Sequence, residues 1–143
     1  MKLKIKHNKI DKKGFVGFLN EINDDFLPKL SDKIKFEDYY RKVTNNANVI
    51  SLYDDEKFIG VIVYYDNFEF CQITLFAISC KYRGKGLGEY LFGFFFEINI
   101  KPTRIITWID NKPAINLYNK IGFKSKEIYQ NSYGVKEILM EKK

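Results

Sequence analysis

The sequence predicts an α+β domain in which a mixed sheet carries helices on both faces, in αβα layers. Apolar residues repeat with a helical period early in the chain and with strand-like patterns afterwards. The predicted order is β-α-α-β-β-β-α-β-α-β-β, which gives seven strands. With 143 residues, 45% of them hydrophobic, the chain is expected to form a single domain over residues 1–143.

The N-terminal part predicts one strand and two helices. Apolar residues alternate with lysines over residues 3–7, as in a short strand. Apolar side chains at i, i+3, i+4 and i+7 predict a helix from Phe15 to Phe26 that ends near Pro28, and a second helix from Phe36 to Ala47. The end of the first helix and the loop after it carry four carboxylates that could attract a cation but are expected to be solvated: Glu21, Asp24, Asp25 and Asp32.

From residue 48 onward the pattern is that of strands alternating with two more helices. The run from Phe68 to Ser79 is apolar on both faces, which predicts a long central strand. Gly122 is expected to end the last helix. The other predicted elements are strands at 48–53, 58–65 and 104–109, helices ending at about Asn99 and spanning Lys112 to Ile121, and a final hairpin of strands at 123–130 and 135–141.

The charge of the chain leaves a nucleic-acid-associated protein open as an alternative. Lys plus Arg number 24 against 18 acidic residues, for a net charge of +6. Only Arg41, Arg83 and Arg104 are arginines, whereas proteins that read nucleic acids favour the forked donors of that residue. A nucleic-acid partner is therefore not expected.

Neither a membrane nor a metal ion is expected as a partner. The apolar run 90–100 is interrupted by Glu97 and is too short to cross a bilayer. His7 is the only histidine, and no Cys/His cluster has metal-ligand spacing. Cys71 and Cys80 are expected to be free thiols because they are too far apart on an extended chain, and with no export signal visible a cytoplasmic location is predicted.

A glycine-rich segment predicts a phosphate site. Gly84, Gly86 and Gly88 alternate with basic residues between a predicted strand and a predicted helix. A helix start presents unpaired N–H groups to an anion, and glycines let the backbone approach it closely. The spacing matches neither a P-loop nor the G-x-G-x-x-G of a dinucleotide fold, although Asp110 imitates the acidic residue of the latter.

Two motifs in this region resemble those of the GNAT superfamily of N-acetyltransferases. R-x-x-G-x-G, read from Arg83 to Gly88, resembles the acetyl-CoA loop, except that Cys80 stands where relatives often have proline. NKPAINLYNKIGF, Asn111 to Phe123, resembles the signature N-x-x-A-x-x-L-Y-x-x-x-G-F. The resemblance covers nearly the whole chain and implies a GNAT-like acyl-CoA N-acyltransferase fold with a mostly antiparallel seven-stranded sheet.

The resemblance also implies acetyl-CoA as acyl donor and a primary amine as acceptor. The pantetheine arm of acetyl-CoA would pair with the long strand, where that strand bulges and diverges from strand 104–109. Its pyrophosphate would bind the N–H groups of residues 83–88, so that valine at Gly86 or Gly88 should weaken binding with little effect on the fold. The implied cofactor-binding residues are Phe76, Ala77, Ile78, Arg83, Gly84, Lys85, Gly86, Leu87, Gly88, Asn111 and Tyr118.

By the same resemblance, Tyr118 is the acid that protonates the leaving thiolate, and an N–H near Ile78 polarises the thioester carbonyl. Gln72 stands where some relatives have a glutamate base. The remaining candidates for the base are Glu69, Asp66 and a chain of water molecules, and none of them is favoured.

The acceptor is not identified and could be an amino-sugar, an amino acid or a protein amine. A non-catalytic acyl-CoA-binding module is a further alternative, and the oligomeric state is not predicted.

Overall fold

The computed structural model describes all residues from 1 to 143. Its longer elements are β1 (Leu3–His7), α1 (Lys12–Ile22), α2 (Phe36–Asn46), β2 (Asn48–Asp54), β3 (Lys57–Tyr65), β4 (Cys71–Ile78), α3 (Leu87–Ile98), β5 (Thr103–Trp108), α4 (Lys112–Ile121), β6 (Lys124–Gln130) and β7 (Lys136–Lys142). Three short 3-10 turns are η1 (Asn23–Asp25), η2 (Leu30–Asp32) and η3 (Cys80–Tyr82). None of the helices is long and apolar enough to cross a bilayer.

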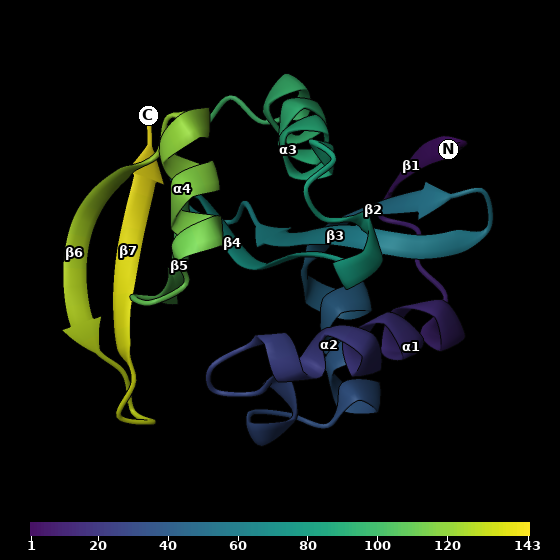
Figure 1. Cartoon of the computed structure of the whole chain (residues 1–143), viewed down its shortest axis with the longest axis horizontal. Helices are drawn as coiled ribbons and strands as arrows, with labels where there is room; N and C mark the ends of the chain where they lie inside the picture. The colour runs from purple at the N-terminus through teal and green to yellow at the C-terminus, as the bar shows by residue number, and fades with distance from the viewer.

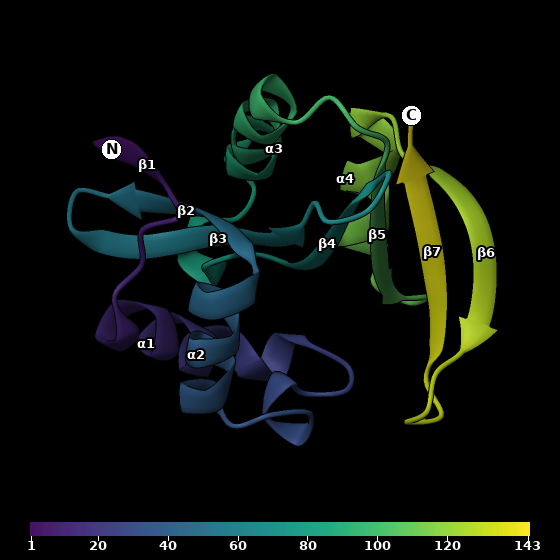
Figure 2. The same ribbon diagram turned by 180° about the vertical axis from the view of Figure 1, so that it is seen from behind.

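The strands form one sheet in the order β1-β2-β3-β4-β5-β7-β6. Every neighbouring pair is antiparallel except β4 and β5, which run parallel. Helices α1 and α2 cover one face, and α3 and α4 cover the other (Figures 1 and 2). The predicted α+β fold with a mixed, mostly antiparallel, seven-stranded sheet is therefore confirmed.

Strand side chains alternate between two hydrophobic cores, one on each face of the sheet. On the face of α1 and α2, Phe15 and Phe18 pack on Phe58, with ring centroids 6.2 and 4.8 Å away. On the other face Phe92 of α3 lies at the centre of an aromatic cluster. The rings within 6.3 Å of it are those of Phe76, Phe95, Phe96, Tyr118 and Phe123.

The first helix is shorter than predicted, because α1 ends at Ile22 and not at Phe26. Both polar atoms of the Asn23 side chain bond to Ser31, which closes the loop that follows the helix. Phe26 is consequently extended, with φ −108°. Phe26 fits the helical spacing of apolar residues only by coincidence, because its side chain lines a cavity and does not pack as part of the helix.

The long central strand is also shorter than predicted, because β4 begins at Cys71 and not at Phe68. The ammonium of Lys101 donates to the carbonyl oxygens of Asp66 and Phe68, at 2.6 and 2.9 Å. These bonds hold the segment before Cys71 as a loop in which Phe68 is exposed and stacks on Phe70.

Strands β4 and β5 pair for only three residues each and then diverge. Cys71–Ile73 pairs with Thr103–Ile105, and no pairing follows. The register between β3 and β4 shifts at this point, which leaves Thr74 of β4 without a partner residue, as in a β-bulge. The bulge and the divergence that the resemblance implied are both present.

Gly88 fits α3 closely against α4. A Cβ atom at Gly88 would lie 2.9 Å from Leu117 Cδ2 and 3.2 Å from Phe76 Cζ, closer than side chains normally approach. The expectation that valine at Gly88 has little effect on the fold is therefore wrong, because its side chain would clash with Leu117 and Phe76. Gly86 has open space around it, but its φ of +77° would strain the backbone of a valine, so the same expectation is wrong there too.

We expect Gly88→Ala to lower the free energy of unfolding by about 1–3 kcal/mol, because the new methyl group overpacks the contact with Leu117. Gly93→Ala in the same helix is the matched control. Nothing lies within 4 Å of its Cβ position, so alanine should stabilise the helix by roughly 0.5–1 kcal/mol. Urea unfolding of both variants measures the difference, and equal effects would contradict the close contact.

Candidate active site

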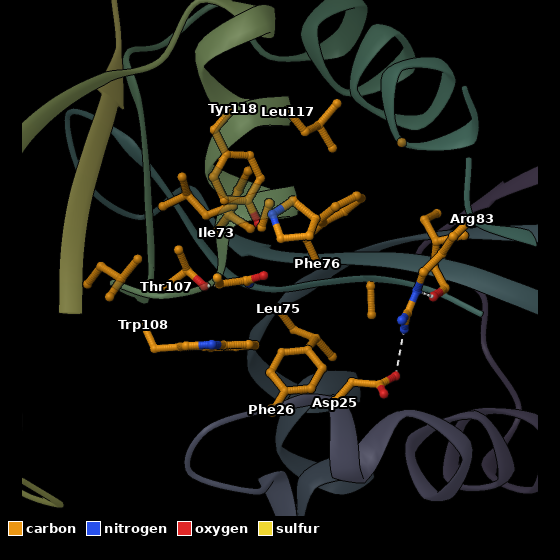
Figure 3. A pocket seen from close by; sticks show the side chains of 18 of the residues that line it. Asp25, Phe26, Ile73, Leu75, Phe76, Arg83, Thr107, Trp108, Leu117 and Tyr118 are labelled. Carbon is orange, nitrogen blue, oxygen red and sulfur yellow. Dashed lines mark hydrogen bonds and ion pairs between the residues drawn. The ribbon is translucent and has the colours of Figure 1, made fainter. Parts of the chain in front are cut away.

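The divergence of β4 and β5 opens a cavity of about 460 Å³. The start of α3, the helix α4 and the loop between α1 and α2 complete its walls (Figure 3). Ten of the predicted cofactor-binding residues line it, and Lys85 does not. Those ten are Phe76, Ala77, Ile78, Arg83, Gly84, Gly86, Leu87, Gly88, Asn111 and Tyr118.

One end of the cavity is a backbone cradle at the start of α3. Gly84 and Gly86 take left-handed conformations, with φ +74° and +77°, and a Cβ at either would meet nothing within 4 Å. The first amide to bond back into the helix is that of Tyr90, which donates to the carbonyl of Gly86. The amides of residues 87–89 therefore have no backbone acceptor and are available to an anion. Lys85 points elsewhere, with its ammonium over the Tyr82 ring.

The side chain of Arg83 ties this cradle to the loop between α1 and α2. Its Nε donates to the carbonyl oxygen of Ile78 at 3.0 Å, and its terminal nitrogen donates to Asp25 Oδ2 at 2.6 Å (Figure 3). Asp25 is therefore engaged, whereas the sequence placed it among solvated carboxylates. Asp25 and Arg83 are 58 residues apart in the chain, so their pairing could not be predicted from a local sequence pattern.

The middle of the cavity exposes polar backbone groups of β4. The amide of Ser79 donates to Ile59 of the neighbouring strand. Because hydrogen-bonding groups alternate in direction along an antiparallel strand, those of Phe76 and Ile78 face away from β3 and into the gap. Ala77 lies between them and also lines the cavity.

Tyr118 of α4 and Asn111, the residue before this helix, both line the cavity. Tyr118 is 3% exposed, its ring packs 5.8 Å from that of Phe123, and its hydroxyl end points into the cavity (Figure 3). Burial raises the pKa of the Tyr118 phenol, so the group stays protonated at neutral pH. Asn111 precedes α4, and its amide nitrogen donates to Thr107 Oγ1 at 2.9 Å.

None of the carboxylates considered as a base from the sequence reaches the cavity. Glu69 and Asp66 are exposed outside it, and the Gln72 amide donates to the backbone carbonyls of Ile73 and Arg104. The carboxylates that do line the cavity are Asp25, Glu89 and Glu137.

Glu137 was not predicted from the sequence as a site residue, and neither were the aromatic residues Phe26 and Trp108, which lie beside each other at the cavity wall (Figure 3). Strand alternation in the last hairpin, which turns Glu137 away from the buried Ile138, was the available signal. No group of three or more His, Cys, Asp or Glu side chains is placed to hold a metal ion.

A family model described as "Acetyltransferase (GNAT) family" matches residues 15–123, most of the chain. The chain therefore belongs to the GNAT family of acetyltransferases, and the acyltransferase class predicted from the two motifs is confirmed. The UPF0157 protein YqkA of Bacillus subtilis is 26% identical over 116 residues. That match covers 80% of this chain but only 32% of the relative, so this chain spans about a third of its length.

Solved structures share the fold across nearly the whole chain. A GNAT family acetyltransferase from Streptococcus pneumoniae gives a TM-score of 0.77 at 20% identity, covering 99% of this chain and 98% of that one. A GNAT family acetyltransferase from Elizabethkingia anophelis, solved with acetyl-CoA bound, gives 0.74 at 17% identity, covering 99% and 97%. At these identities the likeness establishes the fold.

We expect Asp25→Asn to tighten binding of acetyl-CoA by up to about fivefold, roughly 1 kcal/mol. The change removes a negative charge near the cradle and releases Arg83 to contact an anion. Asp24→Asn is the control, because Asp24 pairs with Lys29 and does not line the cavity. Isothermal titration measures both. Weaker binding by Asp25→Asn would instead mean that the ion pair pre-organises the cradle.

Proposed function

We propose that the protein transfers an acetyl group from acetyl-CoA directly to a primary amine. The observation that carries the proposal is the continuous gap that runs from the free amides at the start of α3 to the hydroxyl of Tyr118. Family membership supports it, as does the acetyl-CoA bound in the Elizabethkingia anophelis relative. The two free cysteines support a cytoplasmic location.

The residues of the gap fit an acyl-CoA in charge and in shape. The cradle at Gly84 and Gly86 has room for a pyrophosphate and offers unpaired N–H groups to it. The N–H and C=O of Phe76 and the N–H of Ile78 face the gap and would bond the amides of a pantetheine arm, in the manner of an added strand, while the Ile78 carbonyl accepts from Arg83. Asn111, held by Thr107, would contact the same arm.

In the proposed reaction the acceptor ammonium first loses one proton to solvent. The resulting amine nitrogen forms a bond to the thioester carbon, and the carbon–sulfur bond then breaks. A backbone N–H of β4 stabilises the negative charge that develops on the carbonyl oxygen. The Tyr118 hydroxyl gives its proton to the departing thiolate. The proton lost by the attacking nitrogen restores that hydroxyl, so the products are an N-acetyl amine and a free thiol.

We expect Tyr118→Phe to lower kcat about a hundredfold while acetyl-CoA still binds, because the ring that packs on Phe123 is kept and only the proton donor is lost. Thiol release with a panel of primary amines measures kcat, and calorimetry measures binding. Tyr90→Phe, on the exposed side of α3, is the control.

An unchanged kcat for Tyr118→Phe would make Tyr118 a packing residue only. Binding of acetyl-CoA without turnover of any amine would indicate an acyl-CoA-binding module, and no binding would overturn the proposed function.

A further inference from the structure

Beyond the gap for the acyl donor, the cavity has an aromatic wall built from two distant parts of the chain. Phe26, from the loop between α1 and α2, meets the ring of Trp108 at the end of β5 edge to face, with centroids 5.6 Å apart. Leu27 and Ile106 line the cavity as well, and both are exposed apolar side chains. This end of the cavity therefore offers an apolar surface to a ligand (Figure 3).

Glu137 of β7 stands beside this wall. It is the register partner of Trp108, so the two side chains lie on the same face of the sheet. Asp25 is paired with Arg83, and Glu89 with Lys120 at 2.8 Å, but no lysine or arginine pairs with Glu137. It is thus the one carboxylate of the cavity wall without a lysine or arginine partner.

The charges around Glu137 favour a positive ligand. Tyr129, its partner on β6, has a phenol whose pKa is raised by burial and by the negative charge of Glu137, so the neighbouring group stays neutral. The cations that line the cavity are Arg83, which is held by Asp25, and Lys33, which is exposed on the loop after η2.

We propose that Glu137 binds the ammonium group of the acceptor, while Phe26 and Trp108 contact a bulky apolar group next to it. This inference rests on the proposed acetyl transfer and names its acceptor class: a primary amine on an apolar or aromatic group, without a carboxylate beside the amine. An adjacent carboxylate would lie close to Glu137 and be repelled. Both an arylalkylamine and the N-terminus of a peptide that begins with phenylalanine have this chemistry.

The test compares phenethylamine, phenylalanine and a short peptide amide that begins with phenylalanine, by thiol release at saturating acetyl-CoA. We expect phenethylamine or the peptide to be acetylated with a higher kcat/KM than phenylalanine. The ratio between the first two distinguishes a small-molecule acceptor from a peptide. Calorimetry with acetyl-CoA alone is run in parallel, so that failure of donor binding, which would overturn the proposed function, is separated from failure of the acceptor class.

We expect Glu137→Gln to raise the KM of the preferred amine roughly ten- to a hundredfold, as for loss of a charged hydrogen bond, with little change in acetyl-CoA affinity. Glu127→Gln is the matched control, because Glu127 lies on the same hairpin, is exposed and does not line the cavity. Thermal unfolding of both variants checks that the fold is kept.

Three results would overturn the inference: an unchanged KM for Glu137→Gln, a higher kcat/KM for phenylalanine than for both of the other amines, or no turnover of any of the three amines by a protein that binds acetyl-CoA.

Discussion

The divergence of β4 from β5 is the constraint on which the rest of the site depends. A parallel pair inside a sheet normally satisfies the polar groups of both strands, but here pairing stops after Ile73 and Ile105. Arg83 satisfies the carbonyl oxygen of Ile78, but the N–H of Ile78 and both polar groups of Phe76 that face the gap need water or a ligand, because unpaired buried polar groups cost free energy. In the proposed function, a cofactor with amide groups along its length would meet that need, so that its binding would also complete the sheet.

The aromatic cluster around Phe92 holds the two helices that border this gap. Phe92 contacts Phe76 of β4, Tyr118 of α4 and Phe123 just after α4, with centroids 4.9 to 6.0 Å apart. The same packing that stabilises the domain therefore orients the Tyr118 hydroxyl and fixes where α3 begins. Gly88 lets α3 lie close to Leu117 of α4. One glycine of the loop therefore serves the packing of the helices, while Gly84 and Gly86 leave the cradle open.

The sequence predicted what is local and missed what the fold brings together. The glycine loop and the signature around Tyr118 are contiguous, and periodicity placed all seven strands and four helices. The end of α1 was wrong because Phe26 is apolar for contact with Trp108 and not for the helix. The Asp25–Arg83 pair and the position of Glu137 opposite Trp108 depend on tertiary contacts, which no single-sequence pattern contains.

Hydrogen exchange with and without saturating acetyl-CoA tests the central claim most directly, because it reports on the backbone amides themselves. The account predicts that bound acetyl-CoA slows exchange in two segments: residues 75–79, at the end of β4, and residues 84–89, at the start of α3. The amides of β6 should keep their exchange rates. Unchanged exchange in both segments, with acetyl-CoA shown to be bound, would contradict the account, because the donor would then occupy another part of the molecule.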